Sequence, residues 1–299
     1  PIEAVVDLPD HRYQIQRAYQ SDWQNFHRSL AFQHIADLAQ VVRKRVPEIP
    51  LQTVLSDTVF DIGDAQQGVD RTALGRAMDI NACSATNTIQ DKFYAMTYPN
   101  AVAYYTLARS MEPGKPILNM HNQILLEDEL PAETQYAYVH SAMWEGAIAG
   151  LSGTTLPAGS PVLDAPYALE AFATAGMEIN RLTPIVHAFQ RSPTDVAILF
   201  SDASKVFDGG DPHLESARFA FEGSAFCGHT VRYITEEQCA QGLLKEIKVL
   251  ILPETPAVTD ACFEALMSYV KNGGTVARVG TPIPYTERGK SRSDMLPNT

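Results

Sequence analysis

Apolar residues recur every three to four positions from Trp23 to Val42, which predicts a long amphipathic helix. The short apolar-rich stretch over residues 51–55 that follows predicts a β-strand. The same order returns twice: we expect strands over residues 76–81 and 116–120, and helices over residues 99–111 and 132–150. Short strands that alternate with helices of this length are typical of parallel β/α units.

The pattern restarts after residue 190. A continuous apolar run over residues 196–200 predicts a strand that is covered on both faces. We expect further strands over residues 228–234, 249–253 and 275–280, and helices over residues 214–226 and 260–271. Glycines after the second helix suit the left-handed backbone of a helix C-terminus. These elements predict a doubly wound α/β domain over residues 191–282, followed by a polar tail or truncated continuation over residues 283–299.

Polar residues gather where three of the earlier predicted strands end. The clusters are residues 56–57, 79–81 and 119–122. Because the carboxyl ends of parallel strands form the active-site face of a β/α barrel, three such clusters in succession favour a functional site there. The alternative is that each cluster only starts a loop or caps a helix.

The charge balance narrows the class of partner. The chain has 35 acidic and 23 basic residues, a net charge of −12, so it offers no basic surface for nucleic acid. No apolar run approaches the ~20 residues that a membrane-spanning helix needs. Four cysteines lie scattered without the paired spacing of a zinc site, and we expect them to be buried thiols. A cytoplasmic location is favoured, although the chain begins with Pro1 and leaves a preceding signal peptide open.

The later domain resembles a known module. Residues 250–253 and 269–275 are similar to the glutamine-amidotransferase-like domain that follows the barrel in family 42 glycoside hydrolases. In those β-galactosidase-like enzymes this domain mediates trimer contacts and performs no chemistry. Residues 253–255 here are Pro-Glu-Thr, where a true amidotransferase has its nucleophilic cysteine. The resemblance therefore implies an oligomerisation or binding role and a homo-oligomer, with the trimer as the family's form.

The first part resembles the later barrel strands of the same family, on residues 22–26, 115–122 and 142–147. The resemblance implies the C-terminal portion of a (β/α)8 TIM-type barrel over residues 1–190, followed by a flavodoxin-like or amidotransferase-like domain. It further implies a retaining glycosidase that acts on β-linked glycosides, with carbohydrate as its substrate and no cofactor.

The resemblance also implies where the catalytic groups lie. A retaining glycosidase uses two carboxyl groups, one as acid/base and one as nucleophile. The family's acid/base follows strand four as an Asn-Glu pair, whereas this chain offers only Glu3 after Ile2, so that residue is expected outside the chain. The family's nucleophile position, five residues after Pro116, is His121. An imidazole can act as a general base but replaces an ester-forming carboxylate poorly.

Two nearby carboxylates, Glu127 and Glu129, could replace the nucleophile if their loop folds back; the alternative is a solvated loop with acids at a helix N-terminus. His121 itself fits a sugar contact, a metal ligand or a structural role, and no second histidine at metal-ligand spacing accompanies it, so we expect no metal. We expect the side chains at the strand ends to accept hydrogen bonds from sugar hydroxyls: Asp79, Asn81, Asn119 and Asn122.

Two alternatives to hydrolysis remain at this point. The first is a catalytically impaired homologue that binds carbohydrate or assembles as an oligomer, because a histidine occupies the nucleophile position. The second is an unrelated α/β enzyme in which His121 and Asp79 act together in acid/base catalysis.

Overall fold

A computed structural model describes residues 10–56, 60, 69–87, 100–126, 130–207, 211–280 and 283–296. The chain divides into two compact units, each with its own parallel sheet. The β1–β6 unit consists of Leu38–Asp57 and Arg71–Pro193, and the β7–β12 unit consists of Pro1–Asp37, Thr58–Asp70 and Thr194–Thr299. The assignment of residues 1–190 and 191–282 to two particular domain types stays a prediction.

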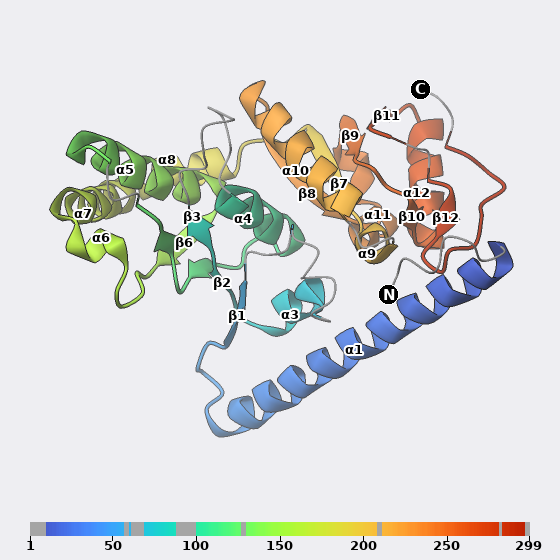
Figure 1. The fold of residues 1–299 in the computed structure, drawn as a ribbon, viewed down its shortest axis with the longest axis horizontal. Helices are drawn as coiled ribbons and strands as arrows, with labels where there is room; N and C mark the ends of the chain where they lie inside the picture. The colour runs from blue at the N-terminus through green and yellow to red at the C-terminus, as the bar shows by residue number, and fades with distance from the viewer. Residues whose placement is uncertain are drawn as a thin grey trace. The chain divides into compact units, whose positions relative to one another are not determined.

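The β1–β6 unit is built on a four-stranded parallel sheet (Figure 1). The strands follow their chain order across the sheet: β1 (Gln52–Ser56), β2 (Ile80–Ser84), β4 (Ile117–Asn119) and β6 (Leu151–Thr154). The helices between and after them are α3 (Arg71–Ala77), α4 (Asn100–Met111), α5 (Ala132–Ala149), α6 (Pro161–Asp164), α7 (Pro166–Arg181) and α8 (Thr183–Gln190). Each β/α unit adds its strand beside the previous one, which is how a β/α barrel grows.

The elements predicted over residues 51–55, 99–111, 116–120 and 132–150 are confirmed within one residue or two. The strand predicted over residues 76–81 is wrong, because α3 continues to Ala77 and β2 starts only at Ile80. Leu74 and Met78 are both buried, and their spacing of four residues is that of a helical face. The polar group at Asp79 therefore precedes its strand instead of ending it.

The two faces of this sheet differ in how they are covered. Asn119 points to the helix side, since its side chain bonds to the Tyr105 hydroxyl on α4. Val54 and Leu118 lie at register positions between the helix-facing residues and so point to the opposite face. Val54 is 43% exposed and Leu118 is half-buried, so this second face is only partly covered by the described residues.

The β7–β12 unit has a second four-stranded parallel sheet, in the order β8 (Val231–Thr235), β7 (Val196–Phe200), β9 (Val249–Leu252) and β11 (Thr275–Arg278). Its helices are α9 (Asp202–Val206), α10 (Asp211–Phe226), α11 (Glu236–Ala240) and α12 (Asp260–Lys271), with a 3-10 turn, η4 (Leu243–Glu246). The four strands and two helices predicted here are confirmed. Gly273 follows α12 with φ of 89°, as expected for a left-handed helix end.

The stretch after Gly280 is packed onto this unit. Strand β12 (Tyr285–Thr286) pairs in parallel with β10 (Ala257–Val258). Ile283 and Leu296 are almost completely buried in the core between the sheet and α12. Residues 283–296 therefore belong to the folded unit and are not a free polar tail.

Helix α1 (Asp10–Arg45) begins well before the predicted start near Trp23. Within the β7–β12 unit its polar side makes the contacts: Ser21 is buried and Arg28 donates to Asp202 at 2.7 Å. The opposite side carries a row of apolar side chains that are all more than half exposed, namely Tyr19, Trp23, Phe26 and Leu30. The periodicity predicted the helix correctly, but the face that would normally be buried is the exposed one.

Candidate functional site

The carboxyl ends of β2, β4 and β6 meet at one edge of the sheet in the β1–β6 unit, and Asn119 ties two of them together. Its Oδ1 accepts from the Ala85 N–H at 3.1 Å and from the His121 N–H at 3.3 Å. Its Nδ2 donates to the Ala85 carbonyl at 3.3 Å and to the Tyr105 hydroxyl at 2.7 Å. Asn119 is fully buried, so it holds the strand ends in place and does not face a ligand.

A second amide pair fixes the next turn. Asn87, just beyond β2, donates from Nδ2 to Asn122 Oδ1 at 2.8 Å, and both side chains are buried. The Asn122 N–H donates to the Thr155 carbonyl at 2.9 Å, and the Thr155 N–H donates to the Asn119 carbonyl at 2.9 Å. The Thr155 hydroxyl bonds to the Met120 carbonyl. All three strand ends are thus joined into one hydrogen-bonded platform.

His121 lies on the turn between Asn119 and Asn122, within this platform. It is exposed, and its backbone is held by the Asn119 side chain. The structure therefore places the predicted residue at the carboxyl end of β4, on a turn that is fixed from both sides. An exposed imidazole on a rigid turn can donate or accept a hydrogen bond.

Asp79 and Asn81 lie at the other end of the sheet. The Asp79 carboxylate accepts from the Leu51 N–H at 2.8 Å and from Arg43 Nη2 at 3.2 Å, and these hydrogen bonds lower the pKa of Asp79. Asn81 is paired in register with Ile117 at the start of β4, two positions before Asn119. The prediction that both residues share a mouth with Asn119 is wrong, because β2 starts after Asp79. The joint catalysis hypothesised for His121 and Asp79 falls with it.

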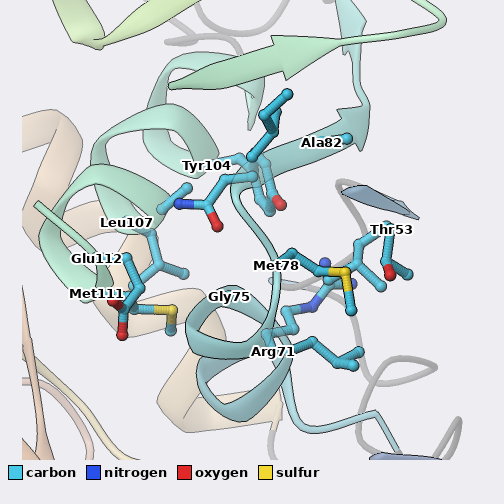
Figure 2. A pocket seen from close by; sticks show the side chains of 14 residues that line it. Thr53, Arg71, Gly75, Met78, Ala82, Tyr104, Leu107, Met111 and Glu112 are labelled. Carbon is cyan, nitrogen blue, oxygen red and sulfur yellow. The ribbon is translucent and has the colours of Figure 1, made fainter. Parts of the chain in front are cut away.

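A small cavity opens beside Asn81, between the sheet and helices α3 and α4 (Figure 2). Its volume is about 30 Å³, enough for one or two water molecules and far too little for a sugar ring. Apolar side chains such as Leu74 and Leu107 line most of it. It is therefore a packing defect within the wall of the unit and not a substrate site.

The carboxylates that hydrolysis needs are not among the described strand ends. Residues 84–87, 119–126 and 154–157 contain no aspartate or glutamate. Glu127 and Glu129, the two predicted alternatives, lie outside the described residues. Within the part of the chain that the structure describes, no three His, Cys, Asp or Glu side chains gather as a metal site would require. Nor is any helix of that part long and apolar enough to cross a membrane.

A second polar cluster lies at the strand ends of the β7–β12 unit and resembles a hydrolytic triad only in composition. Ser201 Oγ donates to Glu236 Oε1 at 2.7 Å, and Ser201 contacts His213 through its backbone N–H, at 3.0 Å from Nε2. His213 Nδ1 lies 2.8 Å from the Glu254 carbonyl and donates to it. Since the His213 imidazole does not contact the Ser201 hydroxyl, it cannot act as the base that would make this hydroxyl a nucleophile.

Burial sets the charge of this cluster. It lowers the pKa of His213 to about 4, so the ring is neutral near pH 7. Burial also raises the pKa of Glu236, whose carboxylate accepts the N–H groups of Ala203 and Thr259 at 2.9 and 2.7 Å. Every polar atom named here is satisfied within the protein, which is typical of a structural network.

The same arrangement of elements occurs in solved glycosidases. The chain superposes on a GH42 exo-carrageenase from Bacteroides ovatus with a TM-score of 0.77 and 19% identity, over 93% of this chain and 41% of that one. A cold-adapted β-galactosidase from Rahnella sp. R3 gives 0.67 and 16%, over 92% and 43%. A β-galactosidase from the psychrophilic Marinomonas ef1 gives 0.68 and 16%, over 94% and 47%.

The chain has a glycoside-hydrolase-like fold. It spans between two-fifths and one-half of the length of these solved structures. No protein-family model matches the sequence, and no curated protein does. The likeness therefore rests on the arrangement of the elements, and it supports the barrel portion predicted for the β1–β6 unit.

The platform residues Asn87, Tyr105 and Thr155 are absent from the predicted site. Asn87 follows the observed end of β2 by three residues, and shifting the predicted strand onto residues 80–84 would have brought it into view. Thr155 follows β6, a strand with only one strongly apolar residue, Leu151. Tyr105 reaches the site from α4, and no local pattern signals such a long-range contact.

Proposed function

We propose that this chain is part of a glycoside-hydrolase-like protein that acts on β-linked glycosides. The sugar would bind at the carboxyl ends of β2, β4 and β6, beside His121. The observation that carries this proposal is the exposed His121 on a turn fixed by buried amides, at the face where β/α-barrel enzymes keep their sites. The similar solved structures, an exo-carrageenase and β-galactosidases, are by their names enzymes that act on sugars.

The proposed mechanism needs a nucleophile, an acid/base and a sugar-binding residue, and of these only the sugar-binding residue, His121, lies in the described part of the chain. A retaining mechanism needs two carboxyl groups ~5–5.5 Å apart. We assign the nucleophile to Glu127 or Glu129, which closely follow His121 in the chain, and the acid/base to a residue outside the described part. His121 would then bind a sugar hydroxyl and orient the ring, because its imidazole cannot form the glycosyl ester that the carboxylate forms.

The second candidate is a homologue that binds carbohydrate without cleaving it. The observation that favours it is the histidine at the nucleophile position, together with the lack of acidic residues at the three described strand ends. Asn119 uses its whole amide within the platform and the Asn122 side chain is buried against Asn87, so in either case binding would rely on His121 and the groups exposed around it.

We further propose that the β7–β12 unit is a flavodoxin-like, amidotransferase-like accessory domain without catalytic function. The first strand of its sheet, β7, lies at an inner position. β8 is added on one side of it, and β9 and β11 follow on the other side, which is the order of doubly wound sheets of the flavodoxin type. Pro253 and Glu254 follow β9, where an amidotransferase would need a cysteine nucleophile. The closed network of Ser201, His213 and Glu236 also supports a structural role.

The test uses the intact protein with a panel of aryl β-glycosides. If the chain hydrolyses one of them, Glu127→Ala or Glu129→Ala should abolish turnover, and His121→Ala should raise KM about tenfold, the loss expected for one or two hydrogen bonds to the sugar. His229→Ala is the matched control, because His229 is exposed in the other unit.

Without turnover, thermal protection by simple β-glycosides decides between the candidates. Protection that is lost in His121→Ala but kept in His229→Ala supports the binding homologue. Turnover and affinity that are both unchanged in His121→Ala would remove His121 from the site. Neither turnover nor protection across the panel would overturn the proposal as a whole.

A further inference from the structure

Two cysteines, Cys239 and Cys262, contact each other in the core of the β7–β12 unit. Cys239 belongs to α11 and Cys262 to the first turn of α12, and both residues are 0% exposed. Their thiols are hydrogen-bonded to each other, and both are free rather than joined in a disulfide. A thiol is a weak donor and a weak acceptor, so this contact alone contributes little to stability.

The starts of the two helices are joined about one turn before the cysteines. The carboxylate of Glu236, the first residue of α11, accepts from the N–H of Thr259, the N-cap of α12, at 2.7 Å. The Thr259 hydroxyl in turn accepts from the Cys262 N–H at 3.3 Å. Cys239 follows Glu236 by three residues. Cys262 follows Thr259 by the same number, so the hydrogen bond between Glu236 and Thr259 holds the two thiols side by side before any bond forms between them.

We infer that Cys239 and Cys262 form a reversible disulfide, which joins α11 to α12 covalently in an oxidising environment and is open in a reducing one. The inference concerns a modification of the β7–β12 unit and goes beyond the proposed function, because it does not depend on whether the other unit binds or cleaves a sugar. An S–S bond is only ~2.05 Å long, so α11, a helix of five residues, must shift slightly toward α12 when the bond forms.

The oxidant in this step is a small disulfide such as oxidised glutathione. One protein thiol loses its proton and attacks the glutathione disulfide, which releases one reduced glutathione and leaves a mixed disulfide on the protein. The second protein thiol loses its proton and attacks the protein sulfur of that mixed disulfide, which releases the second glutathione. The two cysteines thus lose two hydrogens and two electrons in total, and one glutathione disulfide is reduced to two thiols.

Burial makes the first attack depend on a local opening of α11. The hydrogen bond from Cys239, together with burial, raises the pKa of Cys262, so the closed core holds neutral thiols, whereas the thiolate is the form that attacks. Since α11 comprises only Glu236–Ala240, this segment can open without unfolding the sheet. The second attack is intramolecular, and reclosing of the hydrogen bond between Glu236 and Thr259 brings the two sulfurs together for it.

The other two cysteines provide internal controls. Cys227, just after α10, is exposed, so the expectation that all four cysteines are buried is wrong for this one. It should react with oxidised glutathione directly and stop at the mixed disulfide. Cys83 is buried within β2 of the β1–β6 unit, so it reports on burial without the contact between two thiols in α11 and α12.

The first test incubates the folded 299-residue chain with Cys227→Ser in millimolar oxidised glutathione for several hours. The remaining thiols are then blocked, and tryptic peptides are mapped by mass spectrometry. We expect a monomer in which the peptide of residues 233–245 is linked to that of residues 249–271, with the loss of two hydrogens. Dithiothreitol should release the link.

Variants in the same background identify the two sulfurs. Cys239→Ala and Cys262→Ala should each abolish the link, in chains that circular dichroism shows to be folded, whereas Cys83→Ala should leave it unchanged. Hydrogen exchange then measures the effect of the link on the fold. Amides of Glu236–Ala240 should exchange about tenfold more slowly in the oxidised than in the reduced chain, because the disulfide opposes the local opening, and those of Gln52–Ser56 in the other unit should not change.

Glutathione on both Cys239 and Cys262 without a link would overturn the inference, since the two sulfurs would then not reach each other. So would a link that occurs only in a covalent dimer or only in urea. Thiols that stay unmodified in the folded chain would also overturn it, with the reaction of Cys227 in the unaltered chain as proof that the oxidant is active. The glycoside assays are scored separately, so failure of the disulfide leaves the proposed function standing.

Discussion

The buried side chain of Asn119 connects three separate parts of the β1–β6 unit. Its amide makes four hydrogen bonds that join the end of β4 to the turn after β2 and to helix α4. An amide has two donor hydrogens and an oxygen with two lone pairs, so these four bonds use its full capacity. The sequence predicts Asn119 as a sugar ligand, but its position in the chain cannot reveal that it points toward the helices.

Asn119→Ala should therefore lower the free energy of unfolding by about 2–4 kcal/mol, because the Ala85 N–H and carbonyl lose their buried partners. Urea denaturation followed by circular dichroism measures the change. The exposed Asn180 on α7 gives the control: Asn180→Ala should change it by less than about 0.5 kcal/mol. Equal effects of the two substitutions would contradict the role assigned to Asn119.

His213 makes stability depend on pH. Its pKa is about 4 in the folded protein, below the ordinary histidine value of 6.5, because burial disfavours the charged ring. Between pH 6.5 and pH 4, His213 binds a proton in the unfolded chain but stays neutral in the folded chain, so acidification favours unfolding. Stability should fall by about 3 kcal/mol in total between pH 6.5 and pH 4 from this group alone.

The measurement is the free energy of unfolding near pH 7 and near pH 4.5 for the protein and for His213→Gln. The variant should be less stable at neutral pH but should lose less on acidification, since glutamine does not titrate. His229→Gln, at an exposed position, should keep the full pH dependence. The same loss on acidification in all three chains would exclude His213 as its source.

At the scale of the element, Lys115 closes helix α3 from a distant part of the chain. Its ammonium donates to the carbonyls of Gly75, Arg76 and Met78 at 2.7–2.9 Å, at the helix C-terminus. A helix of only seven residues has few carbonyl groups with internal partners, so this cap and the favourable charge at the C-terminus matter. The loop that carries Asp79 is held by the same contacts.

Lys115→Met should lower the free energy of unfolding by about 1–3 kcal/mol and speed hydrogen exchange in Arg71–Ala77. The control is Lys248→Met, because Lys248 forms a single ion pair with Asp195 at 2.9 Å in which both side chains are more than half exposed. Its loss should be below about 1 kcal/mol. Comparable losses for the two lysines would show that the three carbonyl bonds add nothing beyond a surface ion pair.

Most elements could be predicted where local pattern and packing agree. The apolar run of β7 and the amphipathic helix α12 are examples, and both lie where the sequence places them. The prediction of β2 is displaced because residues 76–77 still belong to α3, and the buried apolar residues of this short helical stretch are only Leu74 and, just after the helix, Met78. β6 escapes prediction because Leu-Ser-Gly-Thr has no strand pattern of its own and is positioned by pairing with β4.

The whole molecule consists of two α/β units, each with its own parallel sheet, and the sequence predicts this organisation better than it predicts the site. Hydrophobic periodicity identifies single strands and helices, and the alternation of these elements along the chain predicts the two parallel sheets. The site depends on which end of a strand a residue occupies, and a shift of a few residues at β2 moves Asp79 and Asn81 away from His121. His121 is placed correctly at the end of β4 because its strand is predicted correctly.

The exposed aromatic side of α1 has an optical consequence. The chain has two tryptophans, Trp23 in the β7–β12 unit and Trp144 in the β1–β6 unit, so each unit carries one tryptophan, which can be excited selectively at the red edge of the absorption. Trp23 is 52% exposed, whereas the Trp144 indole N–H donates to Glu178 at 3.2 Å and the ring is partly buried. Trp23→Phe should therefore remove the red-shifted, iodide-accessible part of the emission, and Trp144→Phe should leave it.

Each single-tryptophan chain then reports on the melting of one unit. Coincident urea midpoints for the two chains would mean that the units unfold as one cooperative block, and separate midpoints would mean that each can open while the other stays folded. We expect separate midpoints, because each unit has its own sheet and its own buried core. A fluorescence titration can thus follow the fate of either half of the protein in the presence of the other.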